Sequence, residues 1–153
     1  MSEPIPHPDE PLRILYLEDA PEDAELAIRE LKHAGIVLEW VRVDTEAGFR
    51  EALDSFCPGL VLADFSIPGW SGLAALRLVR VERPDLPYIV VTGTLDEETA
   101  AACIKAGADD YILKERRTRL PHAVVAARKA WGTRVAQRKA EEELRLRNSA
   151  LEA

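Results

Sequence analysis

Short apolar segments alternate with longer amphipathic segments along most of this chain, and that alternation restricts the fold more than any other feature. The apolar segments have the length of buried strands and lie at Leu12–Leu17, Ile36–Val43, Leu60–Asp64, Tyr88–Val91 and Asp110–Leu113. The segments between them carry apolar residues three or four positions apart, which is typical of helices. Strands joined through helices run parallel, and a parallel sheet needs helices on both faces. The sequence therefore predicts an α/β fold with a doubly wound, five-stranded parallel sheet.

Residues that commonly begin or end helices support the same arrangement. Gly35 and Gly107 each follow an amphipathic segment, where glycine commonly ends a helix. Thr45 is a suitable N-cap. We therefore expect helices at Glu22–Ala34, Thr45–Phe56, Ser71–Glu82 and Glu97–Ala106. The charges of Glu39 and Arg42 indicate that the second strand lies at an edge of the sheet.

The two ends of the chain differ from this central region, which covers residues 12–129. Residues 1–11 combine prolines with polar residues and are expected to be a disordered lead-in. From about Leu120 the chain is rich in Ala, Arg, Glu and Leu, which predicts one long helix. Because a helix needs only about ten to fifteen residues to cover the sheet, we expect residues 130–153 to project beyond the domain from about Trp131.

The projecting segment carries a pattern found in coiled coils. Leu144, Asn148 and Leu151 are spaced like one seam, and an asparagine between leucines commonly sets the register. We expect a parallel homodimer through this helix. The alternatives are that the helix folds back on its own domain or stays an unpaired linker.

Composition narrows the classes of protein and of partner. Hydrophobic residues make up 47% of the chain and charged residues 31%, which is ordinary for a soluble domain. The net charge of −7 argues against nucleic acid as the main partner, because nucleic-acid-binding surfaces are usually basic. No apolar run reaches the roughly 18–20 residues of a membrane helix, and no secretory signal pattern is present. Cys57 and Cys103 are expected to be free thiols, so we expect a cytoplasmic protein without a membrane partner.

Reactive side chains follow the predicted strands at the edge where ligands bind in open parallel sheets. They are Glu18 and Asp19 after the first strand, Asp64 at the end of the third, Thr92 after the fourth and Lys114 after the fifth. Three carboxylates in one place repel one another, and a hard divalent cation resolves that repulsion; Mg²⁺ prefers such oxygen ligands, few in number. A lysine and a threonine hydroxyl can hold phosphoryl oxygens. The sequence therefore predicts a Mg²⁺ site that handles a phosphoryl group.

Other phosphate-handling folds fit the sequence less well. A haloacid-dehalogenase-like phosphatase needs a second aspartate two residues after the first, and Ser66 stands there. A flavodoxin-type FMN site needs a Ser/Thr/Gly phosphate loop after the first strand, whereas Glu18–Glu25 is acidic and would repel phosphate. A dinucleotide fold would show a G-x-G-x-x-G motif after a strand, and none is present.

Over Leu12–Lys129 the sequence resembles the response-regulator receiver family. The matching residues are Glu18-Asp19, Asp64, Pro68, Gly72, Thr92-Gly93, Tyr111 and Lys114, with GADDYILK at Gly107–Lys114 especially similar. The resemblance implies a flavodoxin-like (βα)₅ fold with strand order 2-1-3-4-5. Glu18 departs from the commonest pattern, in which aspartate is frequent at this position.

The resemblance also implies a role for each site residue. Asp64 would accept a phosphoryl group from a phosphohistidine of a sensor histidine kinase or a histidine phosphotransfer protein. Asp19, Asp64 and the Ser66 backbone carbonyl would bind Mg²⁺, with Glu18 acting through water. Lys114 would contact the phosphoryl group.

A switch between two states is implied as well. Thr92 would move to bond the phosphoryl group and Tyr111 would rotate inward, which would change the face formed by the fourth helix, fifth strand and fifth helix. The chain would then be a signalling domain that assists its own phosphorylation rather than an enzyme. Two alternatives stay open: an N-terminal receiver fragment of a larger PAS or histidine-kinase protein, and a pseudo-receiver that binds partners without taking phosphate.

Overall fold

A parallel sheet of five strands forms the centre of the computed structural model, which describes residues 10–93 and 96–152. In spatial order the strands are β2 (Leu38–Val43), β1 (Leu12–Leu17), β3 (Leu60–Ala63), β6 (Tyr88–Thr92) and β7 (Asp110–Leu113). Counted along the chain, the order of these strands is 2-1-3-4-5, so the expected doubly wound, flavodoxin-like topology is confirmed. The edge position expected for the second strand is confirmed by β2. The expectation for the lead-in rests mainly on residues 1–9, which lie outside the described residues.

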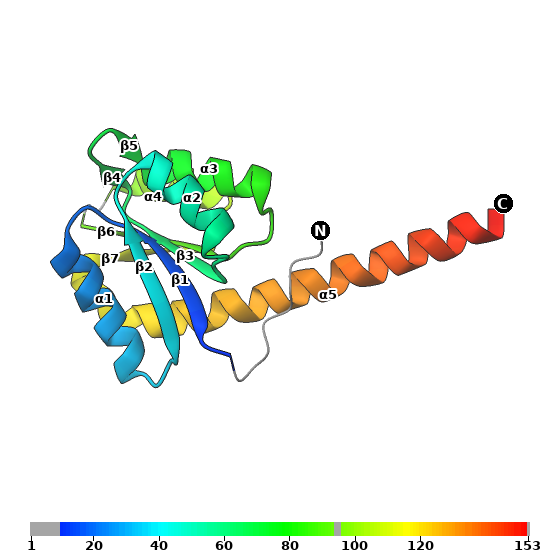
Figure 1. Ribbon diagram of the computed structural model, residues 1–153, viewed down its shortest axis with the longest axis horizontal. Helices are drawn as coiled ribbons and strands as arrows, with labels where there is room; N and C mark the ends of the chain where they lie inside the picture. The colour runs from blue at the N-terminus through cyan, green and yellow to red at the C-terminus, as the bar shows by residue number, and fades with distance from the viewer. Residues whose placement is uncertain (1–9, 94–95, 153) are drawn as a thin grey trace.

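Helices cover both faces of the sheet (Figure 1). One face packs against α1 (Pro21–His33) and α5 (Leu120–Glu152), and the other against α2 (Glu46–Ser55), α3 (Gly72–Glu82) and α4 (Glu97–Lys105). A 3₁₀ helix, η1 (Lys114–Arg119), joins β7 to α5. Hydroxyl groups cap two of the helices: Thr45 Oγ1 accepts the Gly48 N–H at 3.0 Å, and Ser71 Oγ accepts the Ala74 N–H at 3.1 Å.

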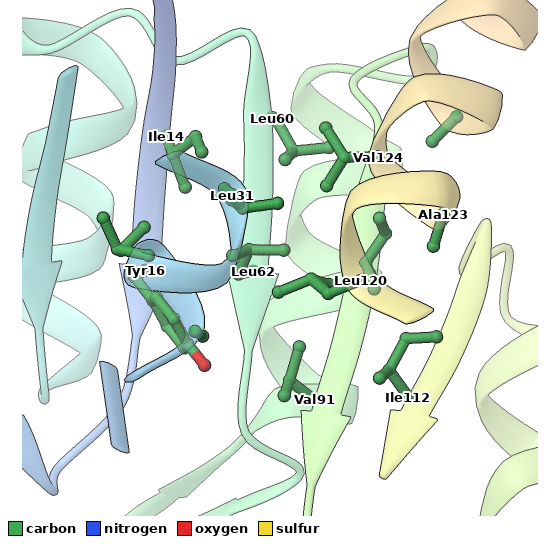
Figure 2. Close-up of a cluster of buried hydrophobic side chains, with 14 of the residues drawn as sticks. Ile14, Tyr16, Leu31, Leu60, Leu62, Val91, Ile112, Leu120, Ala123 and Val124 are labelled. Atoms are coloured by element: carbon green, nitrogen blue, oxygen red, sulfur yellow. The ribbon is translucent and has the colours of Figure 1, made fainter. Parts of the chain in front are cut away.

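Alternate residues of each strand point to opposite faces, which gives the domain two apolar layers. In β1, for example, Ile14 and Tyr16 lie in the α1/α5 layer, whereas Leu15 and Leu17 lie in the other. Figure 2 shows the first layer, in which side chains of α5 lie over those of the central strands. Because both layers are apolar, the polar groups at the strand ends are held on a rigid support.

The loop after β3 contains a short antiparallel hairpin that the apolar pattern did not predict. Its strands are β4 (Ser66–Ile67) and β5 (Trp70–Ser71), and Gly69 turns the chain with a φ of +79°. Trp70 packs edge-to-face on Phe49 of α2 with ring centroids 5.4 Å apart. The hairpin therefore anchors the loop that follows Asp64.

Helix α5 continues well beyond the sheet (Figure 1). Its contacts with the domain extend past Trp131, about two turns further than expected from the sequence. Arg134 donates to the Asp109 carboxylate at 3.3 Å, and Arg138 lies 2.8 Å from the Asp85 carboxylate. These contacts are ionic rather than apolar, which is why the apolar pattern did not indicate them. No helix in the described part of the chain has the length and apolar character to cross a membrane.

Candidate metal and phosphoryl site

The carboxyl ends of the sheet strands bring three acidic side chains together. One carboxylate oxygen from each of Glu18, Asp19 and Asp64 lies within 4.8 Å of the other two. Glu18 is fully buried and Asp64 is 8% exposed, whereas Asp19 is exposed to solvent. The cluster is therefore a concentration of acidic groups that is buried at Glu18 and Asp64 and meets solvent at Asp19.

Lys114 lies against this cluster because it follows β7 directly. Its Nζ donates to Glu18 Oε1 at 3.0 Å, to Asp64 Oδ2 at 2.9 Å and to Asp23 Oδ2 at 2.7 Å. Burial opposes the charge of the ammonium, but the hydrogen bonds to these three carboxylates outweigh it and raise the pKa of Lys114 above its usual range. Lys114 is thus a permanent cation beside the acidic cluster.

Glu18 is the least favourably placed of the clustered carboxylates. Burial and the nearby Asp64 raise the pKa of Glu18 to about 7. The hydrogen bond from Lys114 lowers this pKa but only partly offsets them. Within the described part of the structure its Oε2 is buried without a hydrogen-bond partner. A buried carboxylate oxygen without a donor, close to two other carboxylates, fits a hard divalent cation such as Mg²⁺.

The other expected site residues lie in the loop after β3 and on the two strands β6 and β7. Ser66 follows Asp64 by two positions, and its N–H lies 3.4 Å from Asp64 Oδ1. Thr92 is the last residue of β6 and is 3% exposed. Tyr111, on β7, is partly buried on the α4 side of the sheet, where burial raises the pKa of its phenol. Sheet topology therefore places Asp64, Thr92 and Lys114 at or directly after the carboxyl ends of their strands, whereas Tyr111 lies within β7.

Sequence reasoning missed two charged residues of the site and one buried hydroxyl. Asp23, in the first turn of α1, accepts from Lys114 and from Arg117 Nη2, the latter at 3.4 Å. The indication available in the sequence was a carboxylate in a helix turn that directly follows Glu18-Asp19. Tyr16, two residues before Glu18 on β1, has a fully buried hydroxyl with no partner among the described residues, and burial raises its pKa above the usual range.

Known proteins share both the sequence pattern and the fold. The profile of the response regulator receiver domain matches residues 14–125. The phosphate regulon transcriptional regulatory protein PhoB of Klebsiella pneumoniae is 30% identical over 142 residues, which cover 92% of this chain and 60% of PhoB. The DNA-binding transcriptional regulator NtrC of Escherichia coli K12 is 36% identical over 81 residues, which cover 53% of this chain and 17% of NtrC. The chain therefore spans less than two thirds of either curated relative.

A solved structure supports the fold independently. The two-component response regulator of the LuxR family from Aurantimonas sp. SI85-9A1 superposes with a TM-score of 0.70 at 24% identity, over 88% of this chain and 99% of that one. The profile match covers most of the chain, and it includes β3 with the following Asp64 and β7 with the following Lys114. The chain therefore belongs to the response regulator receiver domain family, the phosphoacceptor domains of two-component signalling.

Proposed function

We propose that Asp64 is the phosphoacceptor of this receiver and takes its phosphoryl group from a phosphohistidine of a sensor histidine kinase or a histidine phosphotransfer protein. The observation that carries the proposal is the position of the Asp64 carboxylate, 2.9 Å from the Lys114 ammonium and within the cluster of Glu18 and Asp19. Asp64 is also nearly buried at the end of a central strand, which fixes the direction of attack.

The transfer needs little covalent chemistry from the protein. A carboxylate oxygen of Asp64 forms a bond to phosphorus as the phosphorus–nitrogen bond breaks, and the imidazole nitrogen leaves with that electron pair. Lys114 and the Thr92 hydroxyl would then hold terminal oxygens of the phosphoryl group. The domain assists its own phosphorylation in this way and is not an enzyme acting on a separate substrate.

Mg²⁺ is the cofactor that we assign to the acidic cluster. Asp19, Asp64 and the Ser66 backbone carbonyl would hold it, with Glu18 acting through water, and the cation would supply neutralisation of charge on the phosphoryl oxygens. Glu18 Oε2 has no hydrogen-bond partner among the described residues, and this supports the assignment because a buried carboxylate oxygen needs a donor or a cation.

The output that we propose is protein contact through the switch and the long helix. Movement of Thr92 and Tyr111 would alter the face formed by α4, β7 and α5, and α5 would carry the change outward. Exposed leucines on the projecting part, Leu144 (58% exposed) and Leu151 (80%), support a parallel homodimer. This helix would join the domain, residues 12–129, to a following PAS or histidine-kinase module through the linker 130–153. DNA binding is a property of the relative NtrC, and the net charge of −7 leaves nucleic acid outside our proposal.

Intact-mass measurement after incubation with acetyl phosphate and Mg²⁺ tests the phosphoacceptor. We expect one hydroxylamine-labile phosphoryl group on the wild type and none on Asp64→Asn. Asp54→Asn, which changes an 81% exposed aspartate, should be labelled like the wild type. Undiminished labelling of Asp64→Asn would disprove the assignment. Binding of beryllofluoride, a phosphoryl mimic, is the second measurement, and a wild type that neither takes a phosphoryl group nor binds beryllofluoride would be a pseudo-receiver.

The dimer is tested separately by sedimentation equilibrium. We expect the wild type to be dimeric at tens of micromolar and Leu144→Glu to be monomeric, because a charge at the seam opposes pairing. A monomeric wild type would leave α5 as an unpaired linker.

A further inference from the structure

The Lys114 ammonium has three N–H groups, and all three are used in contacts with carboxylates. Two of the acceptors, Glu18 and Asp64, belong to the acidic cluster that we assign to the metal. The third and nearest is Asp23, at 2.7 Å, which lies on α1 and outside that cluster. Lys114 is therefore held by carboxylates from three parts of the fold, the end of β1, the end of β3 and the first turn of α1.

Asp23 is itself fixed between two cations. Its Oδ2 accepts from Lys114 and its Oδ1 from Arg117 of η1, and these two basic side chains are only 15% and 19% exposed. The hydrogen bond from Lys114 lowers the pKa of Asp23, so this carboxylate is charged at neutral pH. A short side chain on the first turn of a helix, with both oxygens engaged, is a well-defined anchor for the flexible lysine.

The anchor at Asp23 differs from the other two in what happens when a cation binds. A metal ion held by Asp64, and through water by Glu18, would make both carboxylates weaker acceptors for Lys114. Phosphorylation of Asp64 would then convert its carboxylate into an acyl phosphate. The contact with Asp23 involves neither change, so it can hold Lys114 in place throughout the transfer.

We propose that Asp23 is a positioning residue that holds the Lys114 ammonium beside Asp64, ready to receive a phosphoryl oxygen. The inference rests on the proposed function of Asp64. A merely structural role, in which Asp23 ties α1 to η1 through Arg117, would change the stability of the fold without changing the rate of phosphorylation.

The test is the rate of phosphorylation of the full chain by acetyl phosphate at saturating Mg²⁺, together with Mg²⁺ affinity and melting temperature. We expect Asp23→Asn to slow phosphorylation at least about tenfold, because the lysine loses its orientation. The Mg²⁺ affinity should change less than about threefold, because Asp23 is outside the ligand set that we assign to the metal. Glu22→Gln is the matched control, since it removes the same charge from an exposed neighbour on the same helical turn and should leave the rate unchanged.

Asp23→Glu provides a second variant, because it keeps the charge but moves the carboxylate. It should phosphorylate at a rate between those of the wild type and Asp23→Asn, and it remains informative if the asparagine variant does not fold. A rate for either variant equal to or above that of the wild type would overturn the inference, as would equal slowing by Glu22→Gln. If the wild type itself takes no phosphoryl group, the proposed function fails first, and the two failures are therefore distinguishable.

Discussion

Neutralising Asp19 should stabilise the metal-free protein, because this residue adds repulsion to the cluster and forms no offsetting ion pair within the described part of the chain. Lys114 donates to Glu18 and Asp64, so removing either of those carboxylates would also remove an ion pair. Asp19 is exposed and lies within 4.8 Å of both. Asp19→Asn therefore isolates the repulsion more cleanly than a change at Asp64.

The magnitude follows from that separation. Two unit charges about 4.8 Å apart repel by about 1 kcal/mol in a water-like dielectric, which suits the exposed position of Asp19. Two such pairs, with Glu18 mostly ionised above its pKa of about 7, amount to about 1–2 kcal/mol. For a chain of 153 residues this corresponds to a rise in melting temperature of about 3–6 °C.

Thermal unfolding followed by circular dichroism, in EDTA at pH 8 and low ionic strength, measures the effect. Glu25→Gln, an exposed change of equal charge on α1, is the control and should shift the melting temperature by less than about 1 °C. In saturating Mg²⁺ the order should reverse, because Asp19→Asn loses a ligand and with it much of the stabilisation by metal binding. A variant that melts below the wild type in EDTA, or that shows no reversal in Mg²⁺, would refute the clustering argument.

Three further changes test other parts of the structure. In EDTA, the free energy of unfolding should fall by about 3 kcal/mol as the pH rises from about 4.5 through about 7, because the pKa of Glu18 in the folded protein lies above its unfolded value. Glu18→Gln should remove this pH dependence, which denaturant unfolding curves at several pH values measure. Gly72→Ala should cost about 1–3 kcal/mol and displace the phosphoacceptor loop, because a Cβ there would overlap the Asp64 carbonyl oxygen; the melting temperature measures the cost. Arg138→Gln should cost less than about 1 kcal/mol, because Arg138 is 61% exposed, but should raise hydrogen exchange in α5 near its contact with Asp85.

Much of the architecture was determined by the sequence alone. The apolar runs defined the sheet strands to within two residues at either end, because burial on both faces demands nearly uninterrupted apolar residues. Parallel strands place their carboxyl ends at one edge, so the strand-end positions of Asp64 and Lys114 were enough to predict that they meet. The order of the strands, by contrast, came from the resemblance to a family, since alternation alone does not specify it.

Only the tertiary structure decided which charged side chains pair with one another. The contact of Lys114 with Asp23 joins residues 91 positions apart, and that of Arg138 with Asp85 joins residues 53 apart. Such pairs depend on how a helix is rotated and shifted on the sheet, and they produce no periodic pattern in the sequence. Apolar residues of the core reveal their positions because burial imposes a periodic pattern on the sequence. A charged side chain on a helix can point either to water or to a partner, and the local sequence does not distinguish the two. For this reason the sequence located the site, and the packing of α1, η1 and α5 determined which charges complete it.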